Sequence, residues 1–326
     1  MRTARLHGAA DLRIGDEPLP EAGPDETLVR VTAVGICGSD LHWYSDGAIG
    51  DATLERPLVP GHEGAGEIAS GRRRGERVAI DPAIPCEICR ACRDGYRNLC
   101  YNILFSGHGS TDGMMREVMP WPSRLLFPLP DSVSDAGGAL LEPLGVALWA
   151  LDLGHVPFGG TVAVAGCGPI GLLLIQLLRA AGASRVLAVE PLAHRREWAA
   201  KWGADEVLAP SSEPVSFGAD VAFEFAGNDD GVRIAMESVR PGGRVVLGGI
   251  PGSDVTTFSA SLARRKGLTM AMVRRMNEVY PRAIDVAARG VVALDPLVSS
   301  KAPLDAAPDA FAAAQRRTGL KVIITP

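Results

Sequence analysis

The sequence predicts a two-domain α/β protein in which a β-rich N-terminal region precedes a doubly wound parallel sheet. At 326 residues the chain is too long for one small core. Residues 1 to about 80 alternate short β-like runs, such as 27–34 and 77–80, with glycine and proline turns, which favours a partly open β-barrel or sandwich. From residue 161 onward, apolar strands alternate with helical segments, the pattern typical of a doubly wound parallel sheet.

The elements of the second half follow one another in a regular order. The predicted strands are 162–165, 185–190, 219–224 and 243–247, and the predicted helices between the first of them are 170–181 and 195–202. The tail after residue 306 predicts one amphipathic helix and a last strand at 320–324. All these strands are apolar, as expected for strands that are covered on both faces.

Composition and charge exclude several classes of function. The net charge of -5 provides no basic surplus to neutralise phosphates, so we expect no nucleic-acid partner. The longest apolar run, 170–178, is too short to cross a bilayer, and the N-terminal residues contain no apolar segment of a signal peptide. We therefore expect a cytoplasmic protein, in which clustered cysteines are metal ligands more often than disulfides.

A glycine-rich turn after the 162–165 strand predicts a dinucleotide site. Gly166, Gly168 and Gly171 fit G-x-G-x-x-G, with Pro169 and Ile170 opening the helix whose N-terminus attracts phosphates. The alternative is a strand–helix turn that binds no ligand.

The acidic residue that follows the next strand bears on the choice of cofactor. Glu190 lies 19 residues after Gly171, where its carboxylate suits a ribose hydroxyl and repels a 2'-phosphate, which favours NAD over NADP. Arg195 is the other candidate cofactor contact, because it could meet either the adenine face or a phosphate.

Four cysteines within 15 residues predict a structural zinc site. Cys86, Cys89, Cys92 and Cys100 offer four thiolates that would close a tetrahedron and leave no position for substrate. An iron–sulfur cluster, a redox thiol pair and a nucleic-acid zinc ribbon are the alternatives.

A second metal site is suggested by Cys37 and His62. Each residue alone is as well explained as a buried core side chain. Together with nearby carboxylates such as Glu63 and Glu142, they offer three ligands and one open position, which is the pattern of a catalytic zinc. Asp40 is expected to accept a hydrogen bond from the ring nitrogen of His62 that faces away from the metal.

These motifs together resemble the zinc-dependent medium-chain dehydrogenases/reductases, closest to the sorbitol (polyol) dehydrogenase branch. The matching segments run almost from end to end and occur in the order of the family: residues 37–42, 61–66, 75–78, the four cysteines, 142–144, the glycine turn and 320–322. The resemblance implies a GroES-like catalytic domain at 1–143, with a zinc lobe at 82–101, a Rossmann NAD-binding domain at 144–276, and a return to the catalytic domain at 277–326. It also implies a homodimer or homotetramer.

The resemblance further assigns roles to individual residues. It implies that Cys37 and His62 bind the catalytic zinc, that Glu63 stands at a movable ligand position, and that Glu142 replaces the third, often cysteine, ligand. Which carboxylate completes the coordination sphere stays open. Zinc and NAD together imply oxidation of an alcohol, with its proton leaving through Glu142 and a water.

A second route for the proton involves two residues near Cys37. Ser39 is positioned for a relay through the cofactor ribose to His42, as in related alcohol dehydrogenases. We expect it to assist Glu142.

Departures from the family near the expected substrate leave its identity open. Trp43 stands where a tyrosine is usual, Arg275 follows the family arginine Arg274 where an aromatic is usual, and His108 lies in an altered loop. The expected substrates are polyols, sugar alcohols, sugar acids and cyclitols. L-Threonine or 2,3-butanediol oxidation, a zinc-free reductase and a non-catalytic binding protein on the same fold are the alternatives.

Overall fold

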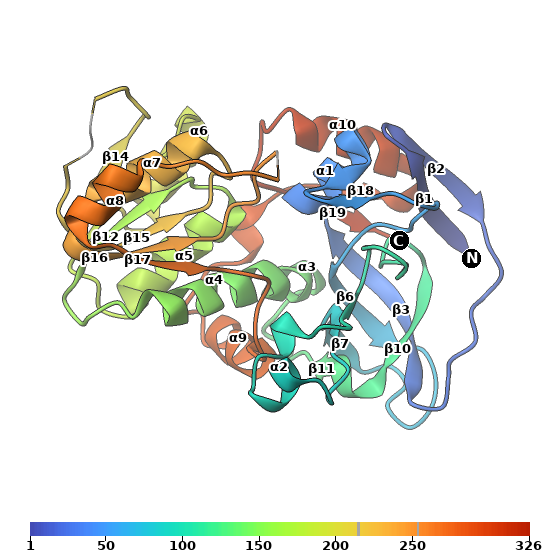
Figure 1. The fold of residues 1–326 in the computed structure, drawn as a ribbon. Coiled ribbons are helices and arrows are strands. Elements are labelled where there is room, and N and C mark those ends of the chain that lie inside the picture. The colour runs from blue at the N-terminus through green and yellow to red at the C-terminus, as the bar shows by residue number, and fades with distance from the viewer. Residues whose placement is uncertain (214–215, 253) are drawn as a thin grey trace. The chain divides into compact units, whose positions relative to one another are not determined.

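The computed structural model describes residues 1–213, 216–252 and 254–326 (Figure 1). The chain divides into two compact units. One unit joins Met1–Glu142 to Asn277–Pro326, and the other is Pro143–Met276. The predicted α/β class, with a β-rich part and a part built on a parallel sheet, is confirmed.

A mixed sheet organises the first unit. Its strand order is β11-β7-β6-β3-β19-β18, with β10 also paired to β3. Neighbours are antiparallel except for β18 and β19. The strands of this sheet are β3 (Glu26–Gly35), β6 (Glu63–Ile68), β7 (Arg77–Ile80), β10 (Val118–Pro122), β11 (Leu126–Pro128), β18 (Val298–Pro303) and β19 (Lys321–Thr325).

Short hairpins and helices surround this sheet. The paired strands are β1 (Arg2–Gly8) with β2 (Asp11–Asp16), β4 (Ala48–Ile49) with β5 (Ala52–Thr53), and β8 (Ala83–Ile84) with β9 (Leu104–Phe105). The helices are α1 (Gly38–Asp46), α2 (Arg90–Arg93), α3 (Asp135–Ala139), the first residues of α4 (Leu141–Gly154), α9 (Tyr280–Ala288) and α10 (Ala307–Gln315), with 3₁₀ turns η1 (Arg97–Leu99), η2 (Ser123–Leu125), η3 (Asp295–Leu297) and η4 (Leu304–Ala306).

The centre of this sheet is apolar, and small residues let helix α3 approach it. Val29, Val31 and Val34 of β3 are buried in the core cluster. Gly138 of α3 lies so close to β6 that an added Cβ would stand 2.9 Å from Cβ of Ala65. A rigid sheet of this kind fixes the residues at its strand ends, and the candidate site lies at such ends.

The second unit is a parallel sheet with the strand order β14-β13-β12-β15-β16-β17. Counted along the chain this is 3-2-1-4-5-6, the doubly wound Rossmann order. Its strands are β12 (Thr161–Ala165), β13 (Arg185–Val189), β14 (Glu206–Leu208), β15 (Ala219–Glu224), β16 (Val239–Leu247) and β17 (Thr269–Met272), and its helices besides α4 are α5 (Pro169–Ala180), α6 (Ala193–Lys201), α7 (Asp229–Ser238) and α8 (Ala260–Lys266). The predicted strand–helix alternation is confirmed.

Candidate active site

Two neighbouring strands bring Cys37 and His62 together. Strand β3 ends at Gly35, and Cys37 caps the N-terminus of α1 two residues later. His62 immediately precedes β6, and Gly35 pairs with Glu63 in the antiparallel ladder. Residues 25 positions apart in the sequence therefore meet at one sheet end. One ligand atom each of Cys37, His62 and Glu63 lies within 4.8 Å of the others.

Asp40 connects the two segments that carry these side chains. Its fully buried carboxylate accepts hydrogen bonds from the backbone N–H groups of Cys37 (2.9 Å) and Gly61 (3.1 Å), and it lies 3.5 Å from Nδ1 of His62. Burial acts to raise the pKa of Asp40, but His62 and the two N–H groups outweigh it, so the pKa lies below its usual range. The carboxylate is thus ionised and orients His62 with Nε2 on the side away from Asp40.

The three side chains fit a zinc ion by chemistry and spacing. A thiolate, an imidazole and a carboxylate are zinc ligands, with bond lengths of about 2.0–2.3 Å. Ligand atoms bound to one tetrahedral zinc stand about 3.4–3.8 Å apart, and the observed limit of 4.8 Å lies within a small side-chain adjustment of that spacing. The set leaves one tetrahedral position open.

Glu63 has a partner that the sequence reasoning missed. Nζ of Lys321 lies 2.8 and 2.7 Å from the two carboxylate oxygens of Glu63, and both side chains are buried. In the sequence, Lys321 stands out only as part of the family motif 320–322. A lysine at the head of the apolar run 322–324 was the available signal, because a buried lysine requires an acidic partner.

Glu142 lies close to this cluster but outside the set of three. It stands in the first turn of α4, is buried, and interacts electrostatically with His62, Glu63 and Lys321. Burial raises the pKa of Glu142 to about 7, and the negative charge of Glu63 acts in the same direction. Its carboxyl group can therefore take up or release a proton near neutral pH.

Ser39 and His42 lie on α1, next to Cys37 in the chain. Oγ of Ser39 is 3.3 Å from Nε2 of His62, on the side where a metal would bind. His42 pairs through Nδ1 with Asp46 (3.2 Å), and 27% of its side chain is exposed. The serine thus adjoins the metal cluster, whereas the histidine lies nearer the surface.

The four predicted structural ligands converge in the lobe between β8 and β9. One ligand atom of each cysteine lies within 4.8 Å of the others. Sγ of Cys89 lies 3.5 Å from Sγ of Cys92 and 4.0 Å from Sγ of Cys100. Zinc–sulfur bonds of about 2.3 Å in a tetrahedron place sulfurs about 3.8 Å apart, so the geometry fits one zinc ion.

Backbone conformation at the glycine turn makes room for a dinucleotide. Gly166 has φ of +92°, and an added Cβ would stand 2.5 Å from the backbone nitrogen of Ala226. Gly168 caps α5, which starts at Pro169, and an added Cβ there would meet only Nη1 of Arg195, at 3.7 Å. The turn therefore offers an open backbone at a helix N-terminus, as pyrophosphate binding requires.

Glu190 supports the same turn from the end of β13. Its buried carboxylate accepts hydrogen bonds from the N–H groups of Cys167 (2.8 Å) and Leu192 (3.0 Å). Each oxygen keeps a further lone pair, so a ribose contact by Glu190 stays a prediction.

The loop that carries His108 is attached to the His62 segment. The ring of Phe105 lies 5.3 Å from that of His62, and Oγ of Ser106 donates to the carbonyl of Gly61 (2.9 Å). His108 packs edge-on against Trp43, with ring centroids 5.3 Å apart, and Trp43 is buried in the core. This loop thus contacts the His62 segment through Phe105 and Ser106, whereas His108 contacts Trp43.

Arg274, the remaining substrate candidate, belongs to the other unit. It is exposed and follows β17 by two residues. Its contact with substrate stays a prediction.

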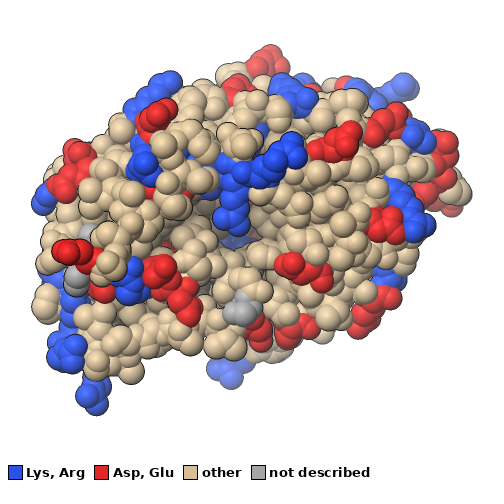
Figure 2. Space-filling model, turned by 90° about the horizontal axis from the view of Figure 1, so that it is seen from above, with Lys and Arg blue, Asp and Glu red and all other residues tan. Residues whose placement is uncertain are grey.

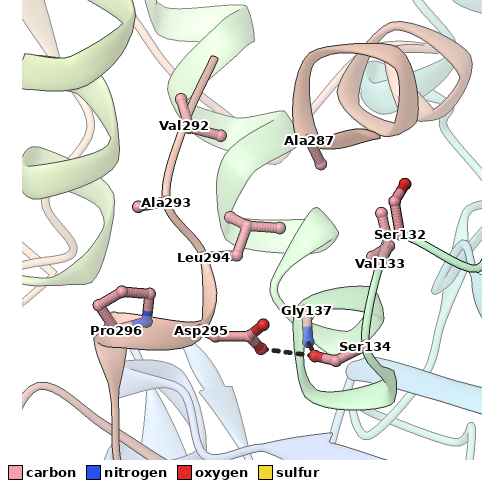
Figure 3. Close-up of a pocket in the computed structure, with 10 residues that line it drawn as sticks. All are labelled: Ser132, Val133, Ser134, Gly137, Ala287, Val292, Ala293, Leu294, Asp295 and Pro296. Atoms are coloured by element: carbon pink, nitrogen blue, oxygen red, sulfur yellow. Dashed lines mark hydrogen bonds between the residues drawn. The ribbon is translucent and has the colours of Figure 1, made fainter. Parts of the chain in front are cut away.

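The first unit also contains a cavity whose lining residues include none of the predicted site residues. A cavity of about 180 Å³ is lined by residues of segments 132–137 and 287–296, and in its wall Oγ of Ser134 donates a hydrogen bond to the carboxylate of Asp295 (2.5 Å; Figure 3). Acidic and basic side chains are both scattered over the face shown in Figure 2. Within the described ranges, no helix is both long and apolar enough to cross a membrane.

Comparison with known proteins gives the class to which this fold and this site belong. Residues 23–131 match the alcohol dehydrogenase GroES-like domain, and residues 169–289 match the zinc-binding dehydrogenase domain. The chain belongs to the zinc-dependent medium-chain dehydrogenase/reductase superfamily, in its sorbitol dehydrogenase-like branch. It is therefore an oxidoreductase, with zinc and a nicotinamide dinucleotide as cofactors.

Individual relatives match along the whole chain. Sorbitol dehydrogenase of Bacillus subtilis is 33% identical over 100% of this chain and 97% of its own. L-Idonate 5-dehydrogenase from Escherichia coli superposes with a TM-score of 0.93 at 26% identity, covering 100% of this chain and 98% of its own. A putative zinc-binding dehydrogenase from Sinorhizobium meliloti, bound to NADP, superposes with a TM-score of 0.91 at 31% identity, covering 100% and 99%.

Proposed function

We propose that this chain oxidises a secondary alcohol of a polyol, sugar alcohol, sugar acid or cyclitol, and reduces the ketone in reverse, at the Cys37–His62 cluster. The observation that carries the proposal is the convergence of Cys37, His62 and Glu63 at the end of two adjacent strands, with the buried carboxyl of Glu142 beside them. A zinc ion held by Cys37 and His62 would supply a Lewis acid for the alcohol oxygen, and a bound nicotinamide cofactor would supply the hydride acceptor.

The residues of the cluster would divide the work. Cys37 and His62 bind the metal, and Asp40 fixes the ring of His62 through its Nδ1. Glu142, whose pKa is raised to about 7 by burial, takes the alcohol proton through a water. Ser39 lies 3.3 Å from Nε2 of His62 and assists by accepting a hydrogen bond from the substrate hydroxyl.

We infer that His42 lies further along the proton route, since it stands three residues after Ser39 on the same helix and is partly exposed. Its partner Asp46 would hold the ring in place. Substrate contacts by Trp43, His108 and Arg274 form part of the same proposal. The relatives named for sorbitol and L-idonate support a polyhydroxylated substrate.

NAD is the proposed hydride acceptor. A carboxylate at Glu190 repels a 2'-phosphate, although the Sinorhizobium relative is bound to NADP. Initial rates with equal concentrations of NAD and NADP decide the point, and a preference for NADP would contradict the assignment of Glu190.

We also propose a cytoplasmic homodimer or homotetramer. The resemblance to the sorbitol (polyol) dehydrogenase branch supports this proposal. Light scattering coupled to gel filtration gives the mass. A monomer across the micromolar range would contradict the oligomer.

The role of Glu142 is tested with the pair Glu142→Ala and Glu142→Gln, since both remove the titrating group and only alanine opens a cavity. We expect zinc to stay bound and kcat to fall at least tenfold in both. Unchanged turnover in both variants, with zinc bound, would exclude the proposed role of Glu142.

A panel of polyols, sugar acids, cyclitols, vicinal diols and L-threonine identifies the substrate by NADH formation.

A further inference from the structure

Glu224 is a buried carboxylate at the carboxyl end of β15, in the middle of the parallel sheet. The residue is 1% exposed, and it pairs with Ala165 of β12 on one side and with Leu247 of β16 on the other. Ligands of open parallel sheets bind at the carboxyl ends of the strands. Glu224 therefore lies at the edge of the sheet where a dinucleotide would bind, and the glycine turn and Glu190 do not explain why an acid is buried there.

The carboxylate of Glu224 connects two loops of the backbone. Oε1 accepts a hydrogen bond from the N–H of Gly227, in the loop after β15 (2.6 Å), and Oε2 accepts one from the N–H of Gly249, in the loop after β16 (3.3 Å). Burial raises the pKa of Glu224 above its usual value, and backbone N–H groups of both loops act in the opposite direction by stabilising the carboxylate. One side chain thus holds the loops 225–228 and 248–250 together.

Glycines provide the space in which these loops meet. An added Cβ at Gly249 would stand 2.8 Å from Oε2 of Glu224 and 2.3 Å from the backbone nitrogen of Gly227. The loop after β15 also touches the glycine turn, since an added Cβ at Gly166 would stand 2.5 Å from the backbone nitrogen of Ala226. Three loops at the carboxyl ends of β12, β15 and β16 are therefore packed backbone to backbone beside one carboxylate.

The place of these loops in the sheet indicates which half of a dinucleotide they would meet. A Rossmann sheet consists of two halves, each of which binds one mononucleotide. Glu190, the predicted partner of the adenosine ribose, directly follows β13, so the adenosine half belongs to β12, β13 and β14. The loops that Glu224 holds follow β15 and β16, in the other half of the sheet. They are therefore placed for the nicotinamide half.

We propose that Glu224 is a positioning residue for the nicotinamide half of the cofactor, and that it acts by tying the loops 225–228 and 248–250 to each other. This rests on the function proposed above, in which a nicotinamide dinucleotide accepts the hydride. Glu224 is covered by the protein, so its effect on the cofactor passes through the backbone of the two loops. Loops that are already fixed before binding need no ordering when the ligand arrives, which increases affinity.

The test compares Glu224→Gln with Glu206→Gln, which removes a partly exposed carboxylate from the edge strand β14 of the same sheet. Both oxygens of Glu224 accept an N–H, so the amide group of glutamine must face one of these donors and release one loop. Binding of NADH is followed by its fluorescence, and binding of ADP, which lacks the nicotinamide half, by calorimetry. We expect Glu224→Gln to bind NADH about tenfold more weakly, or about 1.4 kcal/mol, and ADP as tightly as the wild type does. Glu206→Gln should match the wild type with both ligands.

The alternatives give different results. If Glu224 supports only the fold of the sheet, Glu224→Gln weakens NADH and ADP by the same factor, or leaves both affinities unchanged while thermal stability falls; either result would overturn the proposal. Glu224→Asp keeps the charge but is one methylene too short to reach both loops, and it provides the same comparison if the glutamine variant does not fold. The binding measurements need no turnover. A wild type that binds NADH but oxidises no alcohol would therefore refute the proposed function and leave this test intact.

Discussion

Asp40→Asn is the substitution that most directly tests how the catalytic cluster is held. The side chain keeps its shape but loses its charge, and one of its oxygens becomes an amide that donates. Both oxygens of Asp40 accept a backbone N–H, from Cys37 and from Gly61, so the new amide must face one of these donors. The attraction to Nδ1 of His62, 3.5 Å away, is also weakened.

These contacts set the size of the effect. A hydrogen bond to a buried charged group contributes about 1.5–3 kcal/mol. In Asp40→Asn at least one such bond is lost, because the side-chain NH₂ and a backbone N–H then point at each other. We therefore expect the free energy of unfolding to fall by about 2–4 kcal/mol. Loss of the group that orients a metal-binding histidine weakens metal affinity about 10–100-fold, or about 1.4–2.7 kcal/mol.

Zinc competition with a chelator and urea unfolding measure the two quantities on the same preparation. Asp46→Asn is the matched control, because Asp46 lies on the same helix and pairs with His42 but has a half-exposed side chain. We expect the control to change stability by less than about 1 kcal/mol. Zinc affinity in Asp40→Asn equal to that of the control would show that Asp40 does not position His62.

Two further predictions concern other groups. Cys92→Ser removes a buried thiolate from the four-cysteine lobe, so zinc content should fall from two ions per chain to one and the lobe should become protease-sensitive; two ions retained would contradict a structural site. Burial raises the pKa of Asp81 from 3.8 to about 7, so its ionisation destabilises the fold progressively between these pH values. Asp81→Asn keeps an acceptor for the N–H of Ala83. In urea unfolding, its free energy of unfolding should therefore equal that of the wild type at pH 4 and exceed it by about 2–4 kcal/mol at pH 8. An equal difference at both pH values would show that Asp81 does not titrate as stated.

The parts of the molecule that are specified locally could be predicted from the sequence. The turn from Gly166 to Gly171 follows its strand and opens its helix within a dozen residues, so spacing alone defines it. The four-cysteine lobe is local in the same way. Cys37 and His62 belong to different segments, and the choice of these two residues came from the family resemblance as much as from the residues themselves.

The pairing of Glu63 with Lys321 could not be predicted, for a physical reason. The two residues are separated by 258 positions, and they meet only because β6 and β19 lie on opposite sides of β3. Hydrophobic periodicity identifies a strand but not its neighbours. The burial of Trp43 could not be predicted for a related reason. The sequence of a short helix such as α1 does not specify which other segments pack against that helix.

The two zinc sites differ in how the protein offsets the negative charge of the ligands. In the lobe, backbone N–H groups of Ile88 and Cys89 lower the pKa of Cys86 to about 6, whereas burial raises the pKa of Cys92 to about 12. In the cluster at Cys37, the buried ammonium group of Lys321 pairs with the carboxylate of Glu63. A closed structural site needs only a constant charge. Under the function proposed above, the site at Cys37 would admit an alcohol and release its proton, and Lys321, which interacts electrostatically with Glu142, would supply a positive charge near that carboxyl group.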